Sequence, residues 1–419
     1  MDVRVRQKIA IVGSGISGLV CAHLLNDDHE ITVFEANGYA GGHTHTLEVP
    51  VADKVYSVDT GFIVFTESKY PHFAKLLTRL GVASQPSEMS FSVRDAATGL
   101  EYNGTSLNKL FAQRRNLLRP AFYRMLTDIL RFYREAPELL AGEDDTLTLG
   151  AYLADNRYSR EFVHYHILPM GAAIWSASPD DMLDFPAQYF VRFFHHHGFL
   201  QRKDRPAWRT VVGGSHQYVK ALIAPMADRL RLNSPVRGIR RFAQGVEVQT
   251  EMGKAQFDQV ILAVHSDQAL RLLADPSQSE REILGAIHYK ENPTILHTDA
   301  SVLPKNKRAW ASWNYFLPAK SAARATVTYN MNMLQNLDAP VTFCTTLNRD
   351  EEIHPDKIIQ KMTYHHPQFT PGTIQAQKRH HEINGMNRTY YCGAYWGFGF
   401  HEDGVRSGLA VAEKFGKSL

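Results

Sequence analysis

The sequence predicts an α/β protein of two domains, one of which is a Rossmann-type dinucleotide-binding domain. The chain has 419 residues, more than a single hydrophobic core usually serves. An apolar strand at residues 9–12 runs directly into a glycine turn, and apolar residues at a helical period follow the turn. A second strand then ends at Glu35, 22 residues after the first glycine. Strand, glycine turn, helix and acidic residue in this order are typical of a domain that binds a dinucleotide.

The glycine turn at residues 13–18 has the pattern G-x-G-x-x-G. Gly13 permits the tight turn, Gly15 lets the backbone approach a pyrophosphate, and Gly18 lets the helix pack closely on the strand. The first helical residues, Ile16 and Ser17, are expected to present free backbone N–H groups to the phosphates, at the positive end of the helix dipole.

Two further segments extend this predicted site. Glu35, with Ala36 after it, places a carboxylate where it accepts hydrogen bonds from a ribose diol. A glycine pair follows, and it lets the extended chain pass close to the pyrophosphate a second time. The residues of this second approach are Gly41, Gly42, His43 and Thr44.

These features resemble the flavin amine oxidase and phytoene desaturase superfamily, whose members carry a dinucleotide fingerprint, an acidic residue and then Gly-Gly-Arg-x-x-Thr. His43 stands where that arginine is usual, so an imidazole with one donor replaces a fixed charge. The stretches GGHTHT, YNMNMLQ and GFGFHEDG are similar to those of uncharacterised bacterial NAD/FAD-binding members, which look more like lipid desaturases than amine oxidases. The resemblance implies that the cofactor is FAD.

The resemblance also implies a discontinuous Rossmann-type FAD-binding domain, made of residues 1–80, 205–288 and 376–419. Residues 81–204 and 289–375 would form an inserted α+β substrate domain, with a helical part and a sheet. Within the FAD-binding domain, the family's turn beside the flavin and the strand that passes the adenine imply three more cofactor contacts. These are Asp59, Gly61 and Val236.

The stretch GFGFHEDG, residues 397–404, follows the expected last strand of the FAD-binding domain. In the resembling family this loop rides over the flavin, and a glycine-started helix points its N-terminus at the pyrimidine ring. Gly393, Gly404 and Val405 match that pattern, whereas Ala394 stands where the family has an acidic residue.

Three residues are candidates for catalysis. His401 takes the place of a tyrosine that walls the substrate cage of amine oxidases, and it is interpreted either as a proton donor or acceptor or as a loop histidine satisfied by Glu402 or Asp403. Lys290 and His297 lie in the region where amine oxidases place a lysine aimed at the flavin, and their spacing does not choose between them.

Other chemistry receives less support from the sequence. The histidine runs lack the spacing of a metal site, so no metal is predicted. Covalent attachment of the flavin through His43, His45 or Cys392 is left open, although a buried inert thiol is the expected state of Cys392.

The composition limits which binding partners and which cellular location are expected. The formal charge of +3 gives no reason to expect nucleic acid, and three widely spaced cysteines fit a reducing compartment. No secretory signal or membrane-spanning run is found, so the cytoplasm is predicted, with peripheral contact at the inner face of the membrane. Seven basic residues and one acidic residue lie between Leu107 and Arg134. This stretch is either a basic surface for an anionic membrane or lipid headgroup, or a solvated helix face.

The leading functional hypothesis is an FAD-dependent oxidoreductase that abstracts a hydride from a C–H bond of an apolar, fatty-acyl lipid, as a desaturase does. The resemblance adds a lipid-modifying methyltransferase as the expected partner. The alternatives are a redox-neutral double-bond isomerase, an amine oxidase, and a flavin-bearing assembly partner with no activity of its own.

Overall fold

The computed structural model describes residues 6–142, 146–201, 206–319 and 324–419. Its framework is a five-stranded parallel sheet in the order β10-β2-β1-β14-β20. The strands are β1 (Lys8–Val12), β2 (Glu30–Phe34), β10 (Leu230–Arg231), β14 (Gln259–Leu262) and β20 (Thr389–Tyr391). The predicted α/β class with a Rossmann-type parallel sheet is confirmed.

The two faces of this sheet are both buried, because alternate residues of each strand point to opposite sides. Ile9 and Ile11 belong to one core with α1 (Ile16–Leu25), α2 (Pro71–Leu80), α10 (His216–Ile223) and α15 (His401–Lys414). Ala10 and Val12 belong to a second core. Its other members come from α11 (Ser266–Leu272), α12 (Gln278–Gly285), α14 (Pro371–Lys378) and the sheet β11 (Val236–Arg241), β12 (Val246–Thr250) and β13 (Gly253–Phe257).

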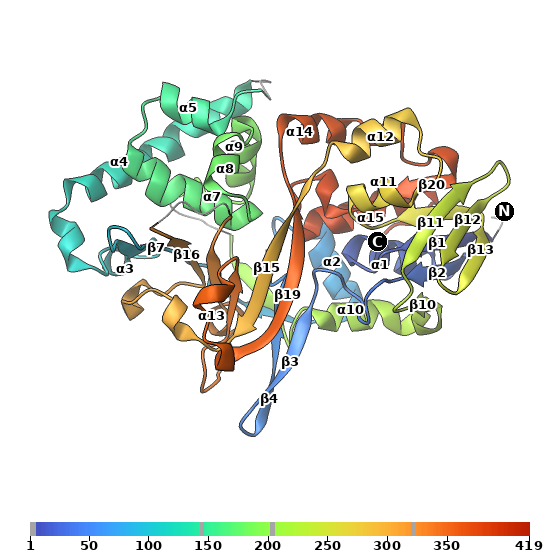
Figure 1. The fold of residues 1–419 in the computed structure, drawn as a ribbon, viewed down its shortest axis with the longest axis horizontal. Helices are drawn as coiled ribbons and strands as arrows, with labels where there is room; N and C mark the ends of the chain where they lie inside the picture. The colour runs from blue at the N-terminus through green and yellow to red at the C-terminus, as the bar shows by residue number, and fades with distance from the viewer. Residues whose placement is uncertain (1–5, 143–145, 202–205, 320–323) are drawn as a thin grey trace.

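A second, seven-stranded sheet has the order β19-β15-β18-β17-β16-β7-β8, and every neighbouring pair except β16 and β7 is antiparallel. Its long strands β15 and β19 cross the middle of the molecule (Figure 1). The strands are β7 (Phe91–Asp95), β8 (Glu101–Asn103), β15 (Tyr289–His297), β16 (Trp313–Leu317), β17 (Val327–Asn330), β18 (Cys344–Leu347) and β19 (Ile358–Pro367).

Helices cover one face of this second sheet, at the end of the molecule opposite the parallel sheet (Figure 1). They are α3 (Leu107–Leu110), α4 (Pro120–Glu135), α5 (Leu149–Asp155), α6 (Arg160–Phe162), α7 (Leu168–Trp175), α8 (Pro179–Leu183) and α9 (Ala187–His196). Val93, Tyr315 and Val327 of the sheet share their core with Phe132 and Phe190 of the helices.

Smaller elements connect the two parts. They are the hairpin β3 (Thr46–Val51) and β4 (Lys54–Asp59), the sheet of β5 (Val64–Thr66), β6 (Ser84–Pro86) and β9 (Trp208–Val211), and the helix α13 (Met331–Gln335). The strands of the parallel sheet thus come from three separate stretches of the chain. The predicted boundaries of the two domains stay a prediction.

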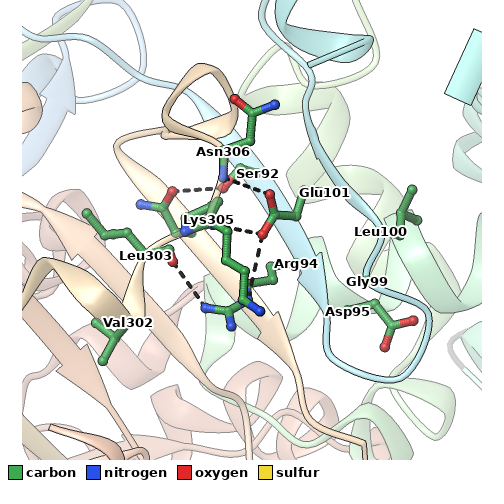
Figure 2. A network of polar contacts seen from close by, with 12 residues as sticks. Ser92, Arg94, Asp95, Gly99, Leu100, Glu101, Val302, Leu303, Lys305 and Asn306 are labelled. Carbon is green, nitrogen blue, oxygen red and sulfur yellow. Dashed lines mark hydrogen bonds and ion pairs between the residues drawn. The ribbon is translucent and has the colours of Figure 1, made fainter. Parts of the chain in front are cut away.

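The β7–β8 hairpin at the sheet edge is held by a buried carboxylate, shown in Figure 2. Glu101 accepts the backbone N–H groups of Lys305 at 2.8 Å and Asn306 at 2.9 Å. Arg94 forms an ion pair with Glu101 and donates to the carbonyl of Leu303 at 3.1 Å. These contacts fix the hairpin against the 303–306 loop, just before the chain enters α3.

Candidate functional site

The glycine turn after β1 contains three glycines that are needed for different reasons. Gly13 has a positive φ of 101°, and a Cβ there would lie 2.6 Å from the carbonyl oxygen of Ala263. A Cβ on Gly18 would lie 2.2 Å from the oxygen of Gly13. Gly15 has an ordinary φ of −65°, and no atom lies within 4 Å of the place where its Cβ would be. The protein itself therefore does not require glycine at this position.

The open space at Gly15 lies at the N-terminus of α1. Gly15 is the residue that precedes this helix, and no side chain caps it. The backbone N–H groups of the first turn, which includes Ile16 and Ser17, therefore lack a side-chain acceptor. An uncapped helix N-terminus beside the open space at Gly15 fits a pyrophosphate, which would supply the missing hydrogen-bond acceptors.

Glu35 is buried beside this turn. One carboxylate oxygen accepts from the backbone N–H of Ser14 at 3.0 Å and from its hydroxyl at 2.5 Å, and the other accepts from Asn37. The backbone of Ser234 donates to the carbonyl of Glu35 at 2.8 Å, which brings the start of β11, with Val236, to the same edge. Asn37 is exposed, so a ribose hydroxyl can take the place of its side-chain amide on the Glu35 carboxylate. Ala36, which lies between Glu35 and Asn37, is also exposed.

The Gly41-Gly42 pair packs directly on the glycine turn. This is where the sequence predicts the second passage of the chain near the pyrophosphate. Gly41 forms a parallel β-bridge with Gly15, and its N–H donates to the carbonyl of Ser14 at 3.0 Å. A Cβ on Gly42 would lie 3.3 Å from the Cα of Gly15. A Cβ on Gly61 would lie 2.1 Å from the carbonyl oxygen of His43, so the chain passes there just as closely.

His43 is surrounded by other rings and keeps one nitrogen free. Its ring centroid lies 5.0 Å from Tyr364, 5.5 Å from His366 and 6.2 Å from His265. Its Nε2 is buried and has no hydrogen-bond partner among the described residues. Burial, with His365 nearby, lowers the pKa of His43 to about 4, so the ring is neutral near pH 7. A buried unsatisfied nitrogen next to the glycine pair fits a contact with a bound cofactor.

His401 is held by protein groups and not by its acidic neighbours. Its Nε2 lies 2.6 Å from the hydroxyl of Tyr218, which in turn contacts the hydroxyl of Thr44. The ring stacks on Phe62 with centroids 3.6 Å apart. Burial lowers the pKa of His401 to about 3, with His43 contributing, so it is neutral and does not act as an imidazolium donor near pH 7. The expectation that Glu402 or Asp403 satisfies His401 is wrong.

Glu402 and Asp403 cap two helices. Glu402 accepts the N–H groups of His72 at 3.1 Å and Phe73 at 3.0 Å, which are orphan donors in the first turn of α2. Asp403 accepts the N–H of Phe400 at 3.1 Å and so caps α15. That cap starts α15 at His401, three residues before the predicted start at Gly404.

The two Gly-Phe pairs before His401 join the FAD-binding part to the helices. Trp175 donates to the carbonyl of Phe398 at 3.3 Å, and Tyr189 donates to the carbonyl of Gly397 at 2.7 Å. The ring of Phe400 stacks on Phe193 with centroids 4.8 Å apart. These contacts place residues 397–400 between the two parts of the molecule.

The start of α15 lies against α1. A Cβ on Gly404 would lie 2.7 Å from the Cγ2 of Ile16, and Gly393 donates its N–H to the hydroxyl of Ser407 at 3.0 Å. Val405 is fully buried in the core shared by α1 and the parallel sheet. Its side chain is therefore a packing residue, and only its backbone is available for the predicted cofactor contact.

Asp59 is engaged by protein groups on both carboxylate oxygens. Its carboxylate accepts from the hydroxyl of Thr46 at 2.5 Å, from the N–H and hydroxyl of Ser215, and from the side chain of Gln335 at 3.0 Å. Burial raises the pKa of Asp59 to about 6, although these donors favour the ionised form. Asp59 joins three distant segments, and its predicted contact with the cofactor stays a prediction.

Lys290 and His297 both lie on β15, and Lys290 is paired in register with His366, whose ring centroid lies 5.5 Å from that of His43. Lys290 forms an ion pair with Asp181 in α8, so its amine is engaged by a carboxylate. His297 is fully buried, where its Nδ1 accepts the N–H of Asp299 at 3.0 Å and its Nε2 lies 2.7 Å from the hydroxyl of Thr346. Both nitrogens are used within the second sheet. These contacts give His297 a structural role, and the choice between Lys290 and His297 stays a prediction.

The candidates for covalent attachment also differ in their surroundings. Cys392 is fully buried, with its sulfur 3.9 Å from that of Cys21. His45 stacks on Tyr39 and lies 3.1 Å from the hydroxyl of Tyr364. Of the three, His43 has the unpartnered nitrogen. No group of three or more His, Cys, Asp or Glu side chains in the described part of the chain is arranged to hold a metal ion.

Sequence reasoning missed Tyr218 and Tyr364. Tyr218 is fully buried in α10 and connects Thr44 to His401, and Tyr364 on β19 contacts His45 and Thr60. Neither residue belongs to a motif. Tyr218 could have been noticed because its hydroxyl lies on the apolar face of a helix. A buried hydroxyl there needs a hydrogen-bond partner.

Comparisons with known proteins agree with this site. A family model described as flavin-containing amine oxidoreductase matches residues 16–305. AofH of Mycobacterium tuberculosis, a protein assigned as a flavin-containing monoamine oxidase, is 26% identical over 286 residues, which are 64% of this chain and 59% of AofH. The chain thus spans about three-fifths of that relative.

Solved structures share the fold. Cyclohexylamine oxidase from Brevibacterium oxydans has a TM-score of 0.70 and 17% identity, covering 98% of this chain and 100% of its own. A fatty acid isomerase from P. acnes has a TM-score of 0.71 and 17% identity, covering 98% of this chain and 99% of its own. Within the described residues, no helix has both the length and the apolar composition to cross a membrane.

Proposed function

Because the chain belongs to the family of flavin-containing amine oxidoreductases, with FAD as its cofactor, we propose that it removes a hydride from a C–H bond of an apolar, fatty-acyl substrate. Gly15, the uncapped N-terminus of α1, Gly42 and the free Nε2 of His43 would hold the cofactor. The fold alone does not choose the substrate, since cyclohexylamine oxidase and the P. acnes fatty acid isomerase both share it.

The observation that supports an apolar substrate is the use of the carboxylates in the site's segments. Asp59, Glu402 and Asp403 each accept hydrogen bonds from backbone or side-chain donors, and Glu35 does so on both oxygens. None of them is left to pair with an ammonium group. A cationic amine would therefore have to compete with these protein donors for a carboxylate, which costs free energy in a desolvated site.

The neighbouring imidazoles support the same choice. His43 and His401 have lowered pKa values, at about 4 and about 3, so they add no charge near pH 7. His401 is also hydrogen-bonded to Tyr218 and stacked on Phe62. Its ring is therefore not available to form one side of an aromatic cage around an amine. Uncharged rings of this kind suit an apolar substrate.

In the proposed reaction a hydride leaves one carbon and a proton leaves its neighbour and is released to solvent, so a C=C double bond forms. Bound FAD supplies the acceptor for the hydride and its two electrons, and an external electron acceptor then takes those electrons on. The chain contributes orientation and exclusion of water, which Phe398 and Phe400 support by closing the region between α15 and the helices.

Anaerobic mixing of the FAD-loaded protein with substrates tests this proposal. We expect an unsaturated fatty acid or its phospholipid to bleach the flavin band and to lose two hydrogens, while a primary amine leaves the band unchanged. Protein stripped of flavin serves as the control. Bleaching by the amine alone would overturn the proposal. If the double bond of the lipid moves and the flavin band is not lastingly bleached, the protein is an isomerase and the desaturase proposal is replaced.

A further inference from the structure

The segment from Leu107 to Arg124, hereafter the 107–124 surface, exposes aliphatic side chains. Leu118 is 87% exposed and Leu107 is 76% exposed, and Leu117 and Tyr123 are each 45% exposed. The segment comprises α3, a short 3₁₀ turn and the start of α4, at the end of the molecule remote from the parallel sheet (Figure 1). Several large apolar side chains exposed within one short segment are unusual for a free surface.

The backbone that carries these side chains is fixed. Gln113 and Arg115 both donate to the carbonyl of Gly99, at 2.8 and 2.6 Å, in the turn of the β7–β8 hairpin. Asn306 donates to the carbonyl of Ala112 at 2.8 Å. The hairpin is in turn held by Glu101 (Figure 2). The leucines therefore project from an anchored frame and do not fold back onto the core.

The charge of the 107–124 surface is entirely positive. It contains five basic residues and no acidic residue. Lys109 pairs with Glu88 and Arg124 with Glu161. In the part of the chain that the structure describes, no ion pair involves the other three, which are Arg114, Arg115 and Arg119. Arg114 and Arg115 are exposed, and their guanidinium groups donate to neutral oxygens.

An open hollow lies beside the exposed leucines. Its volume is about 720 Å³, and Leu117, Leu118, Pro120 and Tyr123 form much of its apolar lining. Arg124 and Arg157 lie at the same hollow, and the one carboxylate among its described lining residues, Asp128, accepts the backbone N–H of Ser159 at 2.7 Å. Apolar groups next to guanidinium groups match the two layers of a lipid surface, where acyl chains lie directly beneath phosphates.

We propose that the 107–124 surface docks this protein onto an anionic bilayer. Leu107 and Leu118 enter the boundary between headgroups and acyl chains, and Arg114, Arg115 and Arg119 contact lipid phosphates. An acidic protein is the rival occupant. The bilayer is favoured because the most exposed side chains are flexible aliphatic tips among arginines, whereas protein interfaces concentrate aromatic anchors at a desolvated centre. This proposal does not depend on the substrate.

Sedimentation of the full-length holoprotein with vesicles tests the proposal. The vesicles are phosphatidylcholine alone, or phosphatidylcholine with phosphatidylglycerol. We expect binding to the anionic vesicles only, with an affinity that falls as salt is raised. The double variant L107S/L118S should lose at least tenfold in affinity, because two apolar side chains no longer enter the lipid. R114Q and R119Q should each lose roughly fivefold, since each basic residue near an anionic surface contributes about that factor.

The matched control is M252S, because Met252 is 92% exposed in the turn between β12 and β13, outside the proposed surface. M252S should bind anionic vesicles as the parent does. All of these positions face solvent or lie at the surface, so the variants should keep the parent's thermal midpoint. Absence of binding to anionic vesicles, or equal binding by L107S/L118S and the parent, would overturn the proposal. Capture of an acidic protein without any vesicle binding would assign the surface to that partner instead.

Discussion

Gly13 and Gly15 stand two positions apart in one turn, yet they are glycine for different reasons. The backbone of Gly13 is left-handed and its neighbour Ala263 leaves no room for a Cβ. Gly15 has an ordinary backbone and open space around it. A side chain at residue 13 is therefore excluded by the protein, and one at residue 15 only by the ligand.

The substitutions G13A and G15A separate these two requirements. We expect G13A to lower the free energy of unfolding of the flavin-free protein by roughly 1–3 kcal/mol, because it combines backbone strain with a close contact. G15A should change that free energy by less than about 1 kcal/mol but weaken FAD binding by about tenfold or more, because its methyl group occupies the phosphate space. Urea unfolding and flavin titration measure the two effects. Unchanged FAD affinity in G15A would contradict this account of the site.

At the scale of elements, the start of α15 organises more than its own helix. Glu402 caps α2 across a sequence separation of 330 residues, and Asp403 caps α15 itself. His401 reaches Tyr218 in α10. Three consecutive residues thus connect one helix N-terminus to two other helices.

Removing the cap from α2 should be measurable. We expect E402A to lower the free energy of unfolding by about 1–2 kcal/mol, because two N–H groups lose a charged acceptor. The amide protons of His72 and Phe73 should exchange faster with solvent, which hydrogen exchange detects. E413A, at an exposed position of the same helix, should leave both quantities unchanged. Equal exchange at His72 in E402A and the parent would show that the cap is not a stabilising contact.

The elements themselves were largely predictable, because they depend on local pattern. The predicted strand at residues 9–12 lies within β1, and the second predicted strand, expected to end at Glu35, is β2 and ends at Phe34. The helix from Pro71 to Leu80 buries Phe73, Leu76 and Leu77 and ends at Gly81 with a left-handed backbone. Periodicity, glycines and caps are properties of neighbouring residues, so the sequence alone contains them.

The site was predictable only where its residues share a motif. The glycine turn and the Gly41-Gly42 pair lie together as expected. The contacts that hold Asp59, Lys290 and His297 come from other parts of the chain, and no motif predicts them. These contacts are Gln335 for Asp59, Asp181 for Lys290 and Thr346 for His297. Spacing along the chain carries no information about such partners.

At the scale of the whole molecule, buried neutral histidines make stability depend on pH. His197 and His297 are buried, and desolvation lowers their pKa values to about 3 and about 4. In the unfolded chain a histidine has a pKa of about 6.5, so the unfolded state binds protons first. Their contribution is therefore complete above about pH 6.5 and is lost as the pH falls toward 4. The raised pKa of Asp59, about 6, acts in the opposite direction, since its contribution is lost as the pH rises.

Comparison of variants isolates the contribution of one histidine. Between about pH 6.5 and 4 the parent should lose about 1.4 kcal/mol more stability per pH unit than H297N, because the variant has no proton to bind at this position. Urea unfolding at several pH values gives the two slopes. H195N, at an exposed position in α9, should keep the slope of the parent. Parallel slopes for the parent and H297N would contradict the assignment.

The pairing of β14 with β20 also has a consequence for how the protein is made. Residues 389–414, which form β20 and α15, are synthesised after every other element described here. Until they leave the ribosome, the growing chain carries β14 as an open sheet edge, and α1 lacks the helix that packs on it at Gly404 and Gly408. The nucleotide-binding half therefore stays incomplete until residues 389–414 have emerged.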